Sequence, residues 1–227
     1  MTLVATAALS LAAVGGADAA TARTCTIKGF SPVKFVVNAA DTTRTFAVST
    51  SGCTQKSWRI DLVGAADEGN ELLATKAEPV VTFSPSLMVN SIAGKYQALV
   101  TVKSTDGKTS KKTLAFSVLR QATFEKTFNI SPEPATAGAT LKVVGTLKRA
   151  SWGPTPKLVT YAGRVVQLQF KAAGSTTFVD KQTLTTDTAG KIASTVKVTK
   201  AGTWRLHFNG NTGNGTANSN TDAVALG

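Results

Sequence analysis

Short segments in which apolar and polar residues alternate recur along the chain, and this pattern is typical of β-strands that bury one face. Residues 56–63 place Trp58 and Ile60 on one face and Asp61 on the other, and residues 164–171 show the same period. No stretch after residue 20 shows the period of a helix of ordinary length. The pattern predicts an all-β protein.

An Ala-Gly-x-aromatic sequence occurs twice, at residues 93–96 and 201–204. In each copy a glycine precedes a predicted strand whose first aromatic, Tyr96 or Trp204, begins an alternating run. We therefore expect these two aromatics to be equivalent core residues of two related units. A chain of 227 residues has room for two domains of common size, so we predict two immunoglobulin-like β-sandwiches in tandem.

The two domains are predicted at residues 23–121 and 122–227, with a very short connection between them. A short linker leaves little freedom, so we expect a fixed elbow. In the second domain we expect residues 191–200 and 202–208 to pair as a hairpin. Residues 149–161 are predicted to form the longest irregular loop.

The N-terminus has the pattern of an export signal. An apolar run at residues 3–14 is followed by small residues that fit a cleavage site, which predicts a signal peptide over residues 1–22. The run is shorter than the roughly 20 residues that cross a bilayer, so we expect no transmembrane segment in the mature chain. A buried N-terminal helix is the alternative. The protein is predicted to be secreted.

Two cysteines, Cys25 and Cys53, predict one disulfide in an exported chain. The bridge would join the first strand to the turn after the third. In antibody domains the bridge joins the two sheets, so this framework differs from an antibody's. Two thiolates are also too few for a four-cysteine zinc site.

Basic residues outnumber acidic ones by 25 to 13, which gives a formal net charge of +12. The excess is shared by both predicted domains. In a secreted protein this balance favours anionic surfaces such as wall polymers or membranes over nucleic acid. The alternative is that scattered lysines on solvent faces provide solubility and protect strand edges.

Several motifs of the second domain occur together in a known class of secreted module. They are Ser131-Pro132-Glu133-Pro134, Gly145, Gly163, the strand at residues 166–170, Asp187 with Gly190, and Gly202-Thr203-Trp204-Arg205. Residues 124–227 resemble the immunoglobulin-like modules of secreted actinobacterial proteins. The first domain is similar to the same kind of module through residues 93–96 and Asp106-Gly107. The resemblance implies export and a sandwich fold and supplies no catalytic residues, although some such proteins are labelled calcium-binding.

The residues do not favour an enzyme. Hydrolase triads need a base beside a nucleophile, and the single histidine, His207, is predicted on the strand face opposite the aromatics. The sequence also has no phosphate-binding loop or dinucleotide-binding glycine pattern. We therefore predict no catalytic residues.

Two loops carry candidate binding residues. Arg149, Trp152, Tyr161 and Arg164 form a candidate partner-binding loop, because aromatics on irregular loops supply contact area. Trp152 is alternatively a plug over the end of the sandwich. The acidic loop is a candidate calcium site, for which a solvated turn is the alternative; its oxygen ligands would come from Asp67, Glu68, Asn70 and Glu71.

The sequence thus predicts a secreted non-enzymatic module that binds a protein or an anionic wall polymer and needs no cofactor. It would contact a component of the cell envelope or a partner protein. The alternative is an inhibitor or a subunit of a secreted complex that acts on a protein target through an exposed strand edge or the Trp152 loop.

Overall fold

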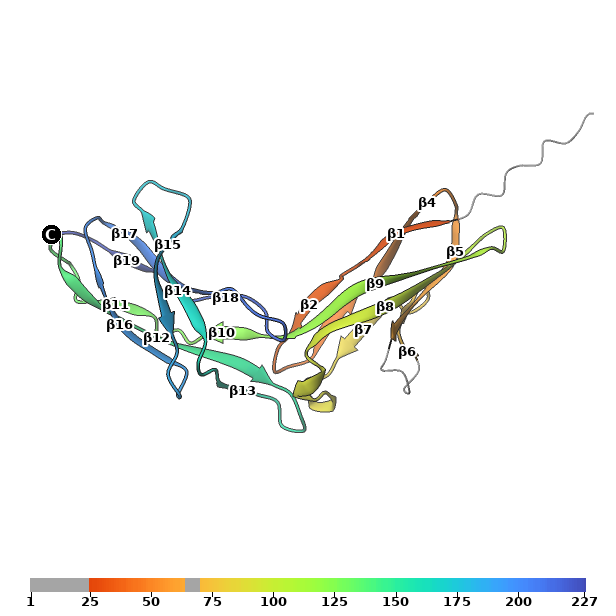
Figure 1. The fold of residues 1–227 in the computed structure, drawn as a ribbon, viewed down its shortest axis with the longest axis horizontal. Helices are drawn as coiled ribbons and strands as arrows, with labels where there is room; N and C mark the ends of the chain where they lie inside the picture. The colour runs from red at the N-terminus through yellow and green to blue at the C-terminus, as the bar shows by residue number, and fades with distance from the viewer. Residues whose placement is uncertain (1–24, 64–69) are drawn as a thin grey trace, which may run out of the picture.

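The computed structural model describes residues 25–63 and 70–227, which form two β-sandwiches lying end to end (Figure 1). The predicted signal peptide, residues 1–22, lies outside the described residues. Each sandwich is filled by its own cluster of buried side chains. Within the described ranges, no helix has the length and apolarity to cross a bilayer. The prediction of two immunoglobulin-like sandwiches in tandem is confirmed.

The first sandwich packs a five-stranded sheet against two strand pairs. The sheet has the order β2-β9-β8-β5-β6, and the facing layer holds the pairs β1-β4 and β3-β7. Phe35, Phe46 and Phe116 meet between the layers, with ring centroids 5.6 to 6.2 Å apart. The elements are β1 (Thr26–Ser31), β2 (Lys34–Val37), β3 (Thr42–Thr45), β4 (Ala47–Ser51), β5 (Gln55–Val63), β6 (Asn70–Thr75), β7 (Val80–Phe83), the short 3₁₀ turns η1 (Pro85–Leu87) and η2 (Asn90–Ile92), β8 (Gly94–Ser104) and β9 (Thr109–Arg120).

Asp61 departs from the predicted alternation in β5. Trp58 and Ile60 are buried as expected, but Asp61 is only 6% exposed. The pairing of β5 with β6 shifts register between Ile60 and Asp61, and such a bulge re-aims the following side chains. Arg59 Nε donates a hydrogen bond of 2.6 Å to Asp61 Oδ1, so the buried carboxylate has a charged partner.

The disulfide between Cys25 and Cys53 is formed, with Cα atoms 5.1 Å apart. Cys25 directly precedes β1 and Cys53 follows β4, and these two strands pair from Thr26 opposite Ser51. The bridge therefore closes the end of one strand pair within a single layer, and the predicted departure from the antibody pattern is confirmed.

The second sandwich is organised around the long strand β12. One edge of β12 pairs with β10 and β11, the other pairs with β13 and β16, and the facing layer has the order β15-β14-β17 with β18 and β19 both on β17. The strands are β10 (Ala122–Phe124), β11 (Asn129–Ser131), β12 (Thr140–Ser151), β13 (Lys157–Thr160), β14 (Val165–Ala172), β15 (Val179–Thr185), β16 (Lys191–Lys197), β17 (Gly202–Phe208), β18 (Ala217–Asn218) and β19 (Asp222–Val224).

Two predictions for this domain are wrong. Residues 191–200 and 202–208 do not form a hairpin, because β16 pairs with β12 whereas β17 pairs with β14 in the facing layer. Residues 149–161 are not an irregular loop, because β12 continues to Ser151 and turns into β13 as a regular hairpin. This β12–β13 hairpin reaches toward the first domain (Figure 1).

Candidate functional site

Trp152, at the tip of the β12–β13 hairpin, is packed into the first domain. It is 4% exposed and belongs, with Ala150, to the buried cluster of the first sandwich. The prediction that Trp152 presents exposed aromatic surface for a partner is therefore wrong. The alternative, that Trp152 covers the end of a sandwich, is closer to the structure, but the sandwich it covers is that of the first domain and not its own.

Hydrogen bonds fix the Trp152 contact. Its indole Nε1 donates to the carbonyl of Asn38 at 3.2 Å, and its backbone N–H donates to Asn90 Oδ1 at 2.8 Å. The next residue, Gly153, donates from its backbone to the carbonyl of Pro85 at 2.9 Å. All three acceptors lie in the first domain, so both polar and apolar groups hold the hairpin there.

A second loop of the second domain completes the junction. Arg120, the last residue of β9, donates its backbone N–H to Gly213 and accepts from Gly215, at 3.0 and 2.9 Å. A side chain on Gly215 would collide with Val36, since a Cβ there would lie 2.6 Å from Val36 Cγ2. The linker, the β12–β13 hairpin and the loop at residues 213–215 thus form three contacts across one elbow. Gly215 allows its loop to approach Val36 closely.

The remaining residues of the predicted loop gather beside this junction. Tyr161 is 3% exposed, so the expectation that it offers exposed contact area is also wrong. The guanidinium carbons of Arg149 and Arg164 lie 4.5 and 5.0 Å from its ring centroid, and its hydroxyl accepts from Asn211 Nδ2 at 2.7 Å. The structure therefore brings Arg149, Tyr161 and Arg164 together as a cation–π cluster that supports the elbow.

Arg120 adds a third guanidinium to this region. It is 7% exposed and its Nε donates to the carbonyl of Ala150 at 2.7 Å. Burial lowers the pKa of Arg120, and the nearby charge of Arg149 lowers it further. The Arg149 Nε is buried without a hydrogen-bond partner among the described residues. The region is strongly cationic, but it is packed against the junction.

The predicted calcium loop falls mostly outside the described residues. Asp67 and Glu68 belong to the segment 64–69, and Asn70 and Glu71 are the first residues of β6, with Glu71 exposed. Among the residues that the structure describes, no group of three or more potential metal ligands comes together. Calcium binding at these four residues stays a prediction.

His207 lies on the outer face of β17. Its two ring nitrogens are 2.7 and 2.8 Å from the side-chain amide oxygens of Asn218 and Asn209. Both contacts are with amides and neither is with a carboxylate or a nucleophilic hydroxyl. This geometry gives the imidazole no partner for triad chemistry.

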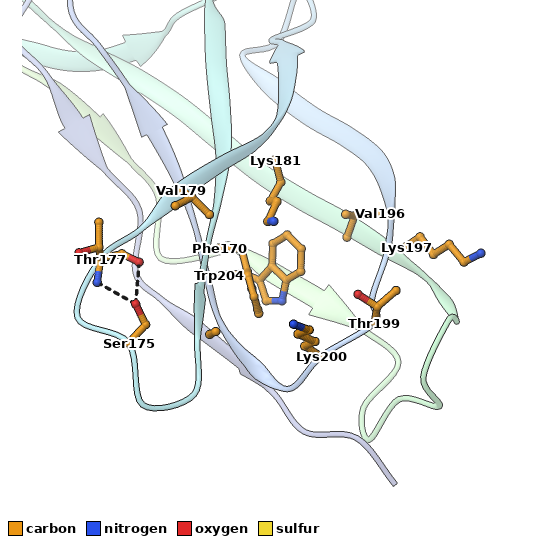
Figure 2. A pocket seen from close by; sticks show the side chains of 11 residues that line it. Phe170, Ser175, Thr177, Val179, Lys181, Val196, Lys197, Thr199, Lys200 and Trp204 are labelled. Atoms are coloured by element: carbon orange, nitrogen blue, oxygen red, sulfur yellow. Dashed lines mark hydrogen bonds between the residues drawn. The ribbon is translucent and has the colours of Figure 1, made fainter.

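A pocket of about 450 Å³ opens between the two layers of the second sandwich, where the edge strands β15 and β16 face each other (Figure 2). Its inner wall is Phe170 and Trp204, whose ring centroids are 4.6 Å apart. Among the described residues of the lining, the charged ones are Lys181, Lys197 and Lys200, and none is acidic or a histidine. The pocket is therefore both aromatic and cationic.

The three lysines of this pocket point in different directions. Figure 2 shows the ammonium ends of Lys181 and Lys200 pointing toward the Trp204 ring from opposite sides, while Lys197 extends away from it. The Lys181 Nζ lies 5.6 Å from the centroid of Phe170. Asp180 is the nearest acid in sequence, but its carboxylate accepts from Gln169 Nε2 at 2.7 Å on the other face of β15.

Trp204 is 3% exposed, and its indole Nε1 has no hydrogen-bond partner among the described residues. A buried N–H without an acceptor costs about 1 to 3 kcal/mol. In Figure 2 the nitrogen edge of the indole faces the side of Lys200 and Thr199. The pocket wall thus holds one unused donor, which is covered from solvent, beside the two cationic donors Lys181 and Lys200.

The first sandwich has a groove of about 610 Å³ at the corresponding place, between the edge strands β6 and β7. Its lining is mostly apolar and includes Tyr96, which is only partly buried. Four lining residues are unusually exposed for their type: Leu72, Leu87, Val89 and Ile92. The two aromatics of the sequence repeat therefore line corresponding pockets, but only Trp204 is fully buried.

Sequence reasoning missed the lysine pocket. One signal was present, because Lys200 stands directly before the Ala-Gly-x-aromatic repeat where Ile92 stands in the first copy. Both residues line the pocket of their own domain. The contribution of Lys181 had no such signal, since it depends on how β15 and β16 face each other across the sandwich.

No family model and no curated protein matches the chain. Similar solved structures include the D00–D0 domain of intimin, with 14% identity over 88% of this chain and 98% of that chain and a TM-score of 0.32. The fibronectin(III)-like modules of CbhA from Clostridium thermocellum show 14% identity, coverages of 88% and 92% and a TM-score of 0.36. The chicken interferon gamma receptor alpha chain shows 9% identity, coverages of 90% and 97% and a TM-score of 0.37. Similarity at this level does not identify a function for the chain.

Proposed function

We propose that this chain is a secreted, non-enzymatic binding module that contacts an anionic component of the cell envelope. The observation that carries the proposal is the large excess of basic side chains without acidic partners. The chain has 25 basic and 13 acidic residues, yet only two ion pairs form among the described residues, Arg59–Asp61 and Lys148–Glu125. Most cationic groups therefore stay available to an external anion.

The junction between the domains supports the same proposal. The packed Trp152 hairpin and the contacts of Arg120 hold both basic domains in one elbow. A rigid pair of domains binds an extended polymer with less loss of conformational freedom than two loosely linked domains. The arrangement suits a spacer or an adaptor on a surface.

Retention on a purified cell-wall preparation tests this function. We expect the exported protein to bind at low salt and to elute as ionic strength rises, since exposed charges are screened within about 10 Å at 0.1 M salt. Elution that does not depend on salt would point to apolar binding. Absence of retention at low salt would contradict the proposal.

The apolar groove of the first domain favours a second candidate function, a subunit or inhibitor in a secreted complex. Among the described residues, β6 and β7 each pair with one strand only, so the other edge of each is open to an added strand. The occupant would be an extended segment of a partner protein whose alternate apolar residues enter the groove.

Co-purification from culture supernatant tests this alternative. Leu87 is 87% exposed in the groove, so Leu87→Asp should release such a partner while leaving the fold intact. Val165→Asp, at a 56% exposed position of the second domain, is the matched control. A partner that survives Leu87→Asp would exclude the groove.

A further inference from the structure

We propose that the pocket between β15 and β16 binds a phosphate group of an anionic envelope polymer. This inference rests on the proposed function and names the ligand chemistry of one site within it. Three features meet there: the unused indole N–H of Trp204, the ammonium groups of Lys181 and Lys200, and a lining whose described residues include no acid.

The donor set identifies the ligand class. A ligand atom that satisfies the indole N–H must be an acceptor, and two ammonium groups beside it favour an acceptor with negative charge. Lysine binds phosphate as a compact point charge and needs no planar fit, whereas arginine is the usual residue for bidentate recognition of carboxylate and phosphate alike. The cations among the described lining residues are all lysines. A phosphate oxygen therefore fits this set of donors.

The size and position of the pocket favour a polymer over a small ion. A volume of about 450 Å³ lies within the range of sites that enclose organic ligands. The pocket opens between two edge strands, so a chain can enter and leave along the seam. Lys197 extends away from Trp204 at the rim, where it would meet the next charged unit of the polymer (Figure 2).

The walls provide the apolar complement of such a ligand. Phe170 and Trp204 form the inner wall, and Val179 and Val196 line the pocket from the two edge strands. Aromatic and aliphatic walls pack against the carbon backbone of a polyol or sugar, while a few donors fix its charged group. The Lys200 side chain lies on the nitrogen edge of the indole, so we expect it to move with the bound phosphate (Figure 2).

The indole N–H of Trp204 gives a direct readout. The chain has three tryptophans, so a ¹H–¹⁵N spectrum of the labelled protein contains three indole signals, and Trp204→Phe identifies the relevant one. The signal should shift saturably when soluble poly(glycerol phosphate) is added. Inorganic phosphate at the same phosphate concentration should act far more weakly, and sodium chloride at the same ionic strength should leave it unchanged.

Charge removal separates the pocket from the overall charge. Lys181→Gln combined with Lys200→Gln should weaken polymer binding roughly tenfold or more, as expected when charge-assisted hydrogen bonds are lost. The matched control is Lys142→Gln with Lys157→Gln, which removes the same charge from exposed positions elsewhere in the domain. We expect this control to retain nearly full affinity.

The outcomes of these experiments test the phosphate site and the proposed function separately. If wall retention persists while the Trp204 signal does not move, the pocket is wrong and the proposed function stands. If retention and the shift are both absent, both proposals fail. An equal response to inorganic phosphate would overturn the polymer as ligand, and equal weakening by both pairs of lysine substitutions would overturn the pocket.

Discussion

The two sandwiches share a plan but differ at the place where the sequence repeats. Strand β8 lies between β5 and β9, and β17 lies between β14 and the short strands β18 and β19. Each begins at the glycine of the repeat. The aromatic that follows lines a pocket between edge strands in both domains, with apolar neighbours around Tyr96 and lysines around Trp204.

A steric requirement for glycine exists at only one of the two repeat positions. A Cβ on Gly202 would lie 2.5 Å from the carbonyl oxygen of Lys171 and 2.5 Å from the Phe170 ring. A Cβ on Gly94 would meet no atom within 4 Å. The second copy is therefore close-packed and the first is open, which shows that a shared motif can fix strand position without fixing its surroundings.

Truncation of the two aromatics should give the largest difference between the domains. Trp204→Ala should lower the free energy of unfolding of the second domain by about 3 to 5 kcal/mol, because it removes a buried ring. Tyr96→Ala should cost the first domain about 2 kcal/mol, because it removes a ring that is only partly buried together with the hydrogen bond of its hydroxyl. Denaturant unfolding, with amide exchange read separately in β8 and β14, measures both losses. Equal losses would restore the predicted equivalence of the two residues.

The disulfide should give the next largest difference, because only the first domain has one. Replacing Cys25 and Cys53 together by serine should lower the free energy of unfolding of that domain by about 3 to 4 kcal/mol, the chain-entropy value for a sequence separation of 28. Unfolding with and without reductant measures the effect. A similar loss in the second domain would mean that the two sandwiches unfold as one unit.

The sequence predicted which face of each strand is buried better than it predicted which strands pair with each other. Alternation placed Val166, Leu168 and Phe170 in the core, where they are 0 to 7% exposed. Alternation could not show that β16 pairs with β12 and not with β17, which lies in the other layer. A two-residue period determines which side of a strand is buried but not which strand lies beside it.

The sites were harder to predict because they are made by contacts distant in sequence. The irregular loop predicted over residues 149–161 is a hairpin, and nothing local in the sequence shows that Trp152 packs near Asn38 and Asn90. The lysine pocket likewise needs two edge strands from different layers. Such features arise from the packing of whole domains, and residue pattern alone does not contain them.

The hairpin contact should give an intermediate effect that couples the domains. Trp152→Ala should weaken the docking of the second domain on the first by about 2 to 4 kcal/mol, the range for truncating a buried aromatic anchor. Small-angle scattering should then show a broader range of elbow angles. Leu158→Ala, at a 44% exposed position of β13, is the control on the same hairpin. An unchanged elbow in the Trp152 variant would show that the linker and the Gly213–Gly215 loop are sufficient.

The smallest effect concerns the hydroxyl of Tyr96, which has no counterpart on Trp204. This hydroxyl donates to the carbonyl of Ile92, so Tyr96→Phe should cost the first domain about 0.5 to 1.5 kcal/mol at neutral pH. Burial raises the pKa of Tyr96 above its ordinary value of 10.0. Above that pH the unfolded chain loses the tyrosine proton first, so the Tyr96 contribution is complete at neutral pH and declines as pH rises through the folded pKa.

The difference in unfolding free energy between the wild type and Tyr96→Phe isolates this contribution, because the lysines that titrate in the same range are common to both proteins. We expect the difference to shrink from pH 9 to pH 11, a range that spans the ordinary tyrosine pKa of about 10. A difference that stays constant across this range would mean that the Tyr96 hydroxyl is as accessible in the folded protein as in the unfolded chain. The first-domain groove would then be open at its aromatic wall, in contrast to the closed wall that Trp204 forms in the second domain.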